Sequence, residues 1–206
     1  MLTIYNEDEK RYQLVEEPDA SCSYTYADYL QWKFKERLEL IKGRILKMSP
    51  APTPKHQQVS VFLSYKLFHF LKKGECKVFT APFDVRLPVK NKKKDTEINT
   101  VVQPDICVIC DETKIDERGC CGAPDLVIEI LSPGNSSHEV KTKFELYQES
   151  GVKEYWLVNP IEENLVVFVL NKEGKFDGAR MYASGDKLSS PAVNGFQIEV
   201  SDIFDN

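Results

Sequence analysis

The chain has 206 residues, of which 42% are hydrophobic and 29% charged, and its formal net charge is −5. This length is enough for one domain with a sizeable core, and the acidic balance argues against a protein that coats nucleic acid nonspecifically, although it does not exclude a local basic cleft. No apolar run approaches the roughly 18 residues of a membrane span, and the acidic N-terminus lacks the apolar core of a signal peptide, so we expect a cytoplasmic protein with no membrane association.

The six cysteines are expected to be reduced thiols in that compartment. Cys107, Cys110, Cys120 and Cys121 resemble a metal cluster in composition. However, Cys107 and Cys110 lie in an apolar run that predicts a strand, where residues three apart face opposite sides. A zinc-binding cysteine pair normally needs a tight turn, so we expect buried or loop cysteines rather than a zinc site.

The N-terminal part of the chain predicts a short helix followed by a hairpin. Thr25 and Asp28 have the spacing of a capping box, which predicts a helix through about Phe34. Apolar residues on both sides of Lys42 and Gly43 predict a β-hairpin with its turn at these two residues.

A longer helix is predicted from Pro54 to Lys73, and Gly74 is the predicted stop. Its predicted core residues recur at intervals of three and four: Val59, Phe62, Leu63, Leu67 and Phe70. Two strands are expected next, around Cys76–Thr80 and Phe83–Leu87, followed by a charged loop.

Two apolar runs, Gln103–Cys110 and Asp125–Leu131, predict central strands because both of their faces are apolar. Ser136 and Glu139 then have capping-box spacing at the start of a helix that is expected to end before Gly151.

Glu154–Val158 predicts the next strand, and about residues 165–200 predict further strands with Gly and Asn turns. We therefore expect a single domain over residues 1–206, with its core at about 54–160 and the N-terminal helix and hairpin at 25–48.

Three acids interrupt the patterns of the two central strands. Asp105, Asp125 and Glu129 are each costly in a buried strand unless they are paired or bind a cation. Asp125 and Glu129 share a face, but they are roughly 13 Å apart along a straight strand. Asp105 lies on the other run and can sit opposite Glu129, so these two are the predicted metal pair. Asp125 is either a supporting residue or a turn cap at the start of its strand.

A pair of carboxylates fits Mg²⁺, because water and a substrate phosphate can complete its octahedron. Mn²⁺ accepts the same oxygen ligands. His138 is the nearest histidine along the chain and is expected to be solvated, so zinc is not expected at this site.

The helix after Ser136 carries a lysine inside its apolar arc. At about 100° per residue the apolar side chains span roughly 160°, and Lys143 falls within that span. Glu139 lies one turn earlier and could pair with it. Alternatively, the amine reaches towards the metal and stabilises negative charge at phosphorus or orients the attacking water. Tyr147, one turn later, is expected mainly in the core, with its hydroxyl near the site.

Five short sequence motifs occur in order across about Glu39 to Pro160: SPAP followed by His56, VVQPDICVI, GAPDLVIEILSP, KFELY and GVKEYWLVNP. This ordered set resembles the PD-(D/E)XK nuclease superfamily and, within it, the bacterial Uma-two endonuclease family.

The resemblance implies an α/β restriction-endonuclease-like core, in which helices flank a mixed central sheet. Asp105 matches the first acid of the motif and Glu129 matches the second. Leu131 occupies the usual lysine position, and the resemblance implies that this lysine has moved into the next helix, at Lys143. The main-chain carbonyl of Ile130 is implied as a further ligand.

The residues expected to surround the two acids and the lysine depart from the superfamily pattern. The helix from Pro54 to Lys73 has no Asp or Glu, although superfamily members often place an acid there. The resemblance instead nominates Glu39, before the hairpin turn, as a further metal residue. Arg44 and Glu139 stand where the family usually has Glu and Asp. His56 matches the family pattern at the helix start, where it either contacts substrate or makes a helix-start hydrogen bond.

These features predict a Mg²⁺-dependent DNA endonuclease that hydrolyses phosphodiester bonds, and cleavage of both strands favours a homodimer. The alternative is a catalytically inactive domain that binds nucleic acid or a protein partner on the same fold. A glycosidase with paired carboxylates is disfavoured, because the lysine has no role there. Basic residues are expected to contact DNA, although the lysine run from 92 to 94 also fits a solvated loop: Lys90, Lys92, Lys93, Lys94, Arg37, Lys42, Arg44 and Lys47.

Overall fold

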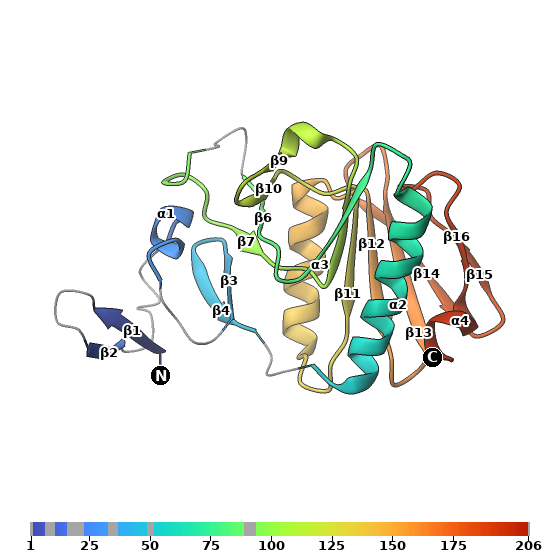
Figure 1. Cartoon of the computed structure of the whole chain (residues 1–206), viewed down its shortest axis with the longest axis horizontal. Helices are drawn as coiled ribbons and strands as arrows, with labels where there is room; N and C mark the ends of the chain where they lie inside the picture. The colour runs from blue at the N-terminus through green and yellow to red at the C-terminus, as the bar shows by residue number, and fades with distance from the viewer. Residues whose placement is uncertain are drawn as a thin grey trace. The chain divides into compact units, whose positions relative to one another are not determined.

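The computed structural model describes residues 2–6, 11–15, 23–32, 37–48, 52–88 and 94–205 (Figure 1). The chain divides into two compact units, which are described one at a time. Unit 1 combines Met1–Met48 with Arg86–Val102, and unit 2 combines Ser49–Val85 with Gln103–Asn206. The single-domain organisation expected from the sequence therefore stays a prediction. In the described residues, no helix is long and apolar enough to span a membrane.

Unit 1 contains short elements near the N-terminus: β1 (Leu2–Asn6), β2 (Arg11–Val15), α1 (Tyr26–Tyr29), β3 (Leu38–Ile41), β4 (Arg44–Lys47) and β7 (Val101–Val102). β1 pairs with β2, and β3 pairs with both β4 and β7, all antiparallel.

The two local predictions in unit 1 are supported by its geometry. Lys42 and Gly43 have φ values of 51° and 80°, so both turn residues are left-handed, as a two-residue hairpin requires. The Asp28 carboxylate accepts a hydrogen bond from the Thr25 backbone N–H at 2.7 Å, which is half of the predicted capping box. The helix ends at Tyr29, earlier than predicted, and the last predicted residues fall outside the described ranges.

Unit 2 contains the larger elements: α2 (Pro54–Leu71), β5 (Lys77–Thr80), β8 (Ile106–Ile109), a 3₁₀ turn (Glu112–Lys114), β9 (Ile115–Asp116), β10 (Gly119–Cys121), β11 (Leu126–Ile130), α3 (Ser137–Ser150), β12 (Glu154–Asn159), β13 (Asn164–Leu170), β14 (Phe176–Ala183), β15 (Lys187–Ser189), β16 (Gln197–Glu199) and α4 (Val200–Phe204). β6 (Val85–Arg86) lies across the boundary between the units.

The main sheet of unit 2 has the strand order β14-β13-β12-β11-β8-β5. β11 and β12 are parallel and are joined through α3, whereas the other neighbours in the sheet are antiparallel. A mixed sheet with flanking helices confirms the predicted α/β fold class. The two runs predicted to be central, now β8 and β11, lie inside the sheet.

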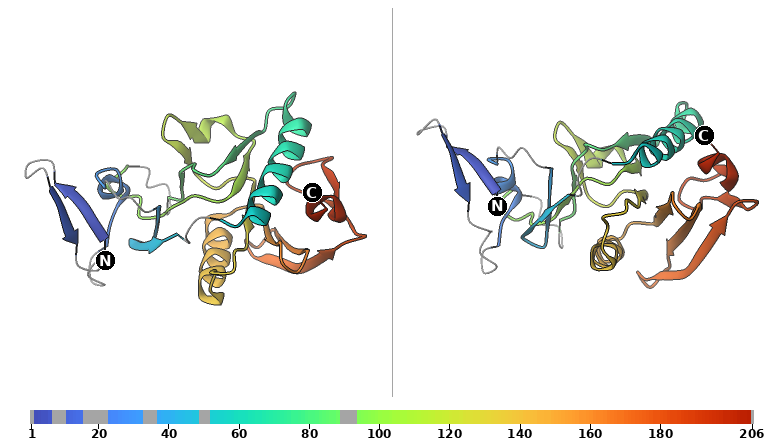
Figure 2. Two further views of the ribbon diagram at one scale, coloured as in Figure 1. Left: turned by 60° about the horizontal axis from the view of Figure 1, so that its bottom comes forward. Right: turned by 90° about the horizontal axis from the view of Figure 1, so that it is seen from below.

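The two faces of this sheet are covered by different helices. Ile128 and Ile130 of β11 pack into a buried apolar cluster with Leu63 and Leu67 of α2. The residue between them, Glu129, points to the other face and contacts α3. Figures 1 and 2 show the two helices on opposite sides of β11 and β12. The alternation along β11 therefore separates an apolar face from a face with buried polar groups.

The ends of the two long helices follow from their capping residues. The Thr53 hydroxyl accepts from the His56 backbone N–H at the start of α2, and Pro54 occupies the first turn. α2 ends at Leu71, and the Gly74 N–H donates to the Leu71 carbonyl at 2.8 Å, while Lys72 between them keeps a right-handed conformation. The core prediction for Phe70 is wrong, since this side chain is 44% exposed.

The start and end of α3 are both as predicted. The Ser136 side chain accepts a hydrogen bond from the Glu139 backbone N–H at 3.1 Å, and Gly151 caps the other end with φ of 83°. These capping interactions define which residues of α3 face the sheet.

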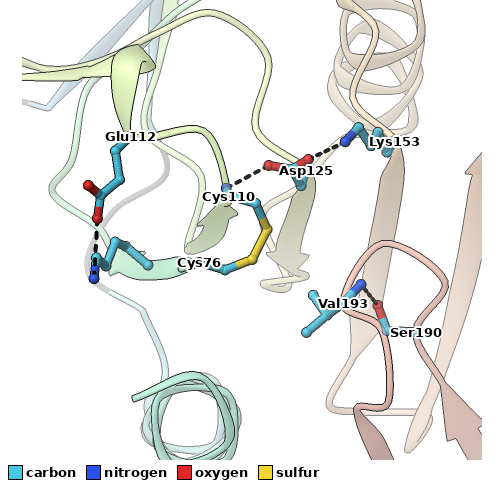
Figure 3. Close-up of a disulfide and its surroundings, with 8 residues drawn as sticks. Cys76, Cys110, Glu112, Asp125, Lys153, Ser190 and Val193 are labelled. Atoms are coloured by element: carbon cyan, nitrogen blue, oxygen red, sulfur yellow. Dashed lines mark hydrogen bonds and ion pairs between the residues drawn. A yellow bond between two sulfur atoms is a disulfide. The ribbon is translucent and has the colours of Figure 1, made fainter. Parts of the chain in front are cut away.

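Cys76 and Cys110 form a disulfide, which overturns the expectation that these two cysteines are reduced (Figure 3). Lys77 and Ile109 are register partners in β5 and β8, so the two cysteines are the next opposed pair along the same strands. Of the other described cysteines, Cys107, Cys120 and Cys121 are free thiols. Burial raises the pKa of the Cys107 thiol, so this residue behaves as a core side chain rather than a nucleophile.

Glu154 is a fully buried carboxylate at the start of β12. It accepts hydrogen bonds from Trp156 Nε1 at 2.6 Å, Ser190 Oγ at 2.6 Å and the Ala192 backbone N–H at 2.8 Å. Burial raises the pKa of Glu154, and these hydrogen bonds oppose that shift without cancelling it. The carboxylate thus ties the segment after β15 to the central sheet.

We predict that Glu154→Ala lowers the free energy of unfolding by about 3 kcal/mol or more, because three buried donors lose their acceptor. Urea denaturation followed by circular dichroism measures the change. Glu162→Ala removes an exposed glutamate and should stay within about 0.5 kcal/mol of wild type. Equal losses in the two variants would contradict the proposed anchoring role.

We also predict that reduction of the Cys76–Cys110 disulfide lowers the free energy of unfolding by about 2 to 4 kcal/mol, because the bridge constrains the unfolded chain. Urea denaturation with and without reductant measures the loss. Cys76→Ser should be as unstable as the reduced protein and should no longer respond to reductant. A non-reduced digest without a peptide linking these two cysteines would contradict the bridge.

Candidate active site

Two carboxylates are neighbours where β8 begins and β11 ends. Ile106 and Ile128 are register partners in these antiparallel strands, so the register extended by one residue places Asp105 opposite Glu129. Asp105 Oδ2 also accepts the Ile130 backbone N–H at 2.8 Å. Directly opposed residues of antiparallel strands have Cβ atoms about 5 Å apart and share a face of the sheet. The two acids are therefore close enough to bind the same ion.

Two side chains of α3 reach the second of these acids. Lys143 Nζ donates to Glu129 Oε1 at 2.9 Å, and Tyr147 OH donates to the same oxygen at 2.5 Å. Lys143 and Tyr147 are four residues apart and therefore share one face of the helix. Lys143 is only 8% exposed, so its position in the apolar arc is explained by this buried ion pair with the strand.

His56 contacts the first acid from the start of α2. Its Nε2 lies 3.3 Å from Asp105 Oδ2, and the side chain is 7% exposed. Its Nδ1 is buried and has no hydrogen-bond partner among the described residues. Burial alone would lower the pKa of His56, but the hydrogen bond and charge of Asp105, together with the Ile130 backbone and the charge of Glu129, raise it overall.

The structure does not place Asp125 in this group. Asp125 precedes β11, at the opposite end of the strand from Glu129. Its Oδ2 accepts the Cys110 backbone N–H at 2.7 Å, and its Oδ1 is 2.6 Å from Lys153 Nζ (Figure 3). Both carboxylate oxygens are thus occupied by contacts with Cys110 and Lys153, which is a structural role other than the turn cap considered from the sequence.

The remaining nominated residues belong to unit 1 or lie outside the described ranges. Glu39 is buried in β3 of unit 1, and its assignment to the metal shell stays a prediction. Arg37, Lys42 and Arg44 are exposed residues of the same unit. Lys90, Lys92 and Lys93 fall outside the described residues, as does the side chain of Lys47, and Lys94 is exposed. Their contacts with substrate also stay predictions.

The residues of unit 2 fit a hard divalent cation better than zinc. Among the described residues there is no group of three or more His, Cys, Asp or Glu side chains that could hold a metal. Mg²⁺ needs fewer protein ligands, because it is usually bound by one or two carboxylates and keeps several waters. Asp105 and Glu129 supply these carboxylates. Asp105 Oδ1 accepts no hydrogen bond from the described residues, whereas Oδ2 is already held by Ile130.

Two acids on neighbouring strands of the mixed sheet, with a lysine and a tyrosine of α3 bonded to one of them, make up the candidate site. Residues 26–201 match the family model Uma2, whose description is "Putative restriction endonuclease". The chain belongs to this family, which confirms the resemblance seen in its sequence motifs.

The chain is also similar to an uncharacterised protein and to a solved structure. An uncharacterised protein of Synechocystis sp. is 26% identical over 177 residues, which cover 84% of this chain and 88% of the relative. The crystal structure of a putative nuclease belonging to DUF820 from Anabaena variabilis superposes with a TM-score of 0.68 at 21% identity, covering 88% of this chain and 98% of that one. The structural likeness supports the fold.

Some contacts of the site were not predicted from the sequence. The sequence predicted the Tyr147 hydroxyl near the site, because Tyr147 lies one helical turn after Lys143, but it did not predict the bond to Glu129. The contact between His56 and Asp105 joins two residues almost fifty positions apart in the sequence, and no local pattern links them. It depends on how α2 packs against the sheet.

We predict that Asp125→Ala lowers the free energy of unfolding by about 1 to 3 kcal/mol, because the part-buried Cys110 N–H loses its acceptor. Thermal and urea denaturation measure the loss. The contribution of the largely exposed Lys153 is expected to be small. Any nuclease activity per folded molecule should be unchanged, and a large loss of activity in a fully folded variant would place Asp125 in the site instead.

Proposed function

We propose that this protein is a Mg²⁺-dependent DNA endonuclease that hydrolyses phosphodiester bonds. The observation that carries the proposal is the buried contact of Lys143 Nζ with Glu129 Oε1 at 2.9 Å, beside the neighbouring Asp105. The family description supports a nuclease-type activity. Mg²⁺ and DNA are the parts of the proposal that rest on the chemistry of the site.

Asp105 and Glu129 would hold the ion, with the main-chain carbonyl of Ile130 as a third oxygen ligand. When bound, Mg²⁺ supplies a water of lowered pKa and polarises a phosphate oxygen. Mn²⁺ would satisfy the same oxygen ligands. The protein's own contribution is to hold the two carboxylates next to each other in a largely buried position.

The surrounding residues fix these carboxylates and supply a positive charge. The Ile130 N–H and His56 position Asp105, and Tyr147 positions Glu129. Lys143 offsets the negative charge that develops on the phosphate in the transition state, and its burial makes this interaction stronger than it would be in water. Cleavage of both DNA strands needs two such sites, which favours a homodimer.

We predict that the wild-type protein nicks or linearises supercoiled plasmid in Mg²⁺ and that chelation abolishes the activity. Asp105→Ala, Glu129→Ala and Lys143→Ala should each reduce the rate about 100-fold or more, because each removes a ligand or a charge that acts in the transition state. Agarose gels with time points measure the rates.

Lys172→Ala, which removes an exposed cation outside the site, is the matched control and should retain wild-type activity. Circular dichroism and thermal denaturation establish that each variant is folded. Equal nicking by the wild type and the three site variants would identify a contaminating nuclease. A folded wild-type protein that cleaves no DNA in Mg²⁺ or Mn²⁺ would overturn the proposed activity.

A further inference from the structure

A cavity of about 510 Å³ lies on the α3 side of the main sheet in unit 2. Side chains of α3, β12 and β13 line it, together with the loop between β11 and α3. Its volume is within the usual range of small-molecule sites, and its walls are mostly apolar with a few polar groups, which is the common composition of a ligand pocket. The carboxylates and the amine of the candidate active site do not line it.

The cavity begins next to the candidate active site. Leu157, which lines the cavity, is the register partner of Glu129 in the parallel pair β11 and β12. Neighbouring strands are about 4.8 Å apart. Phe144, another lining residue, directly follows Lys143 on α3. A substrate held at Glu129 and Lys143 would therefore have its adjoining nucleotide within reach of the cavity.

The apolar part of the wall is aromatic. The rings of Phe144 and Phe168 are 4.9 Å apart in an edge-to-face arrangement, and the rings of Tyr155 and Phe168 are stacked at 5.7 Å. All three residues line the cavity. Aromatic side chains of this kind bind flat heterocycles by stacking, and every nucleobase presents such a face.

The polar part of the wall offers hydrogen-bond donors. Asn135 and Asn159 already use their side-chain oxygens to accept backbone N–H groups, at 2.6 Å and 3.1 Å, so their amide nitrogens are the groups left to donate. Lys141 adds a cation. A ligand for this cavity needs an aromatic body with acceptors on its edge and a negative charge nearby.

We propose that this cavity binds an unpaired nucleobase of the DNA substrate, adjacent to the phosphate that is cleaved. The inference rests on the proposed nuclease function and adds to it the substrate class, namely DNA with at least one base outside the stack. A nucleobase supplies both the stacking face and the edge acceptors, and its phosphate lies near Lys141. An apolar side chain of a protein partner fits less well, because it would make no hydrogen bond with the amide nitrogens of Asn135 and Asn159.

Two variants test the cavity without altering the site residues. Ser137→Trp places a large side chain from the first turn of α3 at the cavity, and His138→Trp makes the same change at the next residue, which is exposed and does not line the cavity. Ile161→Trp enlarges a second lining residue, which is 67% exposed, so the thermal stability should be maintained.

The probe is a DNA duplex with a single unpaired 2-aminopurine, compared with the fully paired duplex and with an abasic nucleotide at the same position. Binding is measured in chelator by anisotropy and by 2-aminopurine fluorescence, and cleavage is measured separately in Mg²⁺. We expect wild type and His138→Trp to bind the duplex with the unpaired 2-aminopurine more tightly than the paired duplex and the abasic duplex. Both proteins should also quench the 2-aminopurine fluorescence by stacking. Ser137→Trp and Ile161→Trp should lose about fivefold or more of this affinity, which is within the range for one stacked base.

The results separate the two proposals. Quenching and tight binding by wild type, without any cleavage in Mg²⁺, would overturn the nuclease function while supporting the cavity. Cleavage by wild type, with both cavity variants binding all three DNAs as wild type does, would overturn the cavity alone. A change of sedimentation coefficient in Ser137→Trp, but not in His138→Trp, would show that a second copy of the chain occupies the cavity and would also overturn it.

Discussion

Glu129 imposes the constraint on which the functional side of this fold depends. A carboxylate near the end of a central strand is costly to bury unless another group compensates its charge. The protein meets this requirement from α3, where Lys143 and Tyr147 both donate to one oxygen of Glu129. The same contacts hold the helix against the sheet. The same hydrogen bonds therefore pack α3 against the sheet and organise the candidate site.

The two faces of the sheet serve different purposes because of the alternation along β11. The face with Ile128 and Ile130 buries a continuous apolar cluster with α2. The opposite face carries Glu129 and the aromatic residues under α3. Buried polar groups elsewhere in unit 2, such as Glu154 and Asp125, have their hydrogen bonds completed by neighbouring segments. The apolar cluster with α2 thus lies on one face of the sheet, and Glu129 with its partners from α3 lies on the other.

Much of this arrangement could be predicted from local patterns. The capping residues of α3, the hairpin at Lys42 and the central position of β11 follow from short-range rules, and the helical arc alone identified Lys143 as exceptional. The contacts of His56 with Asp105 and of Cys76 with Cys110 could not be predicted this way, because each joins residues distant in sequence. The exposure of Phe70 also depends on tertiary packing, which helical periodicity does not determine.

The lysine comes from a helix, whereas the two acids come from strands that are hydrogen-bonded to one another. Asp105 and Glu129 keep their spacing through the β8–β11 ladder, which is rigid. Lys143 keeps its position through the rings packed under α3, where Phe144 contacts Phe168 and Phe176. Substitutions among these rings would change the distance between the Lys143 amine and the Glu129 carboxylate. They would not change the spacing of Asp105 and Glu129. The position of the amine and the spacing of the acids could thus change through separate substitutions.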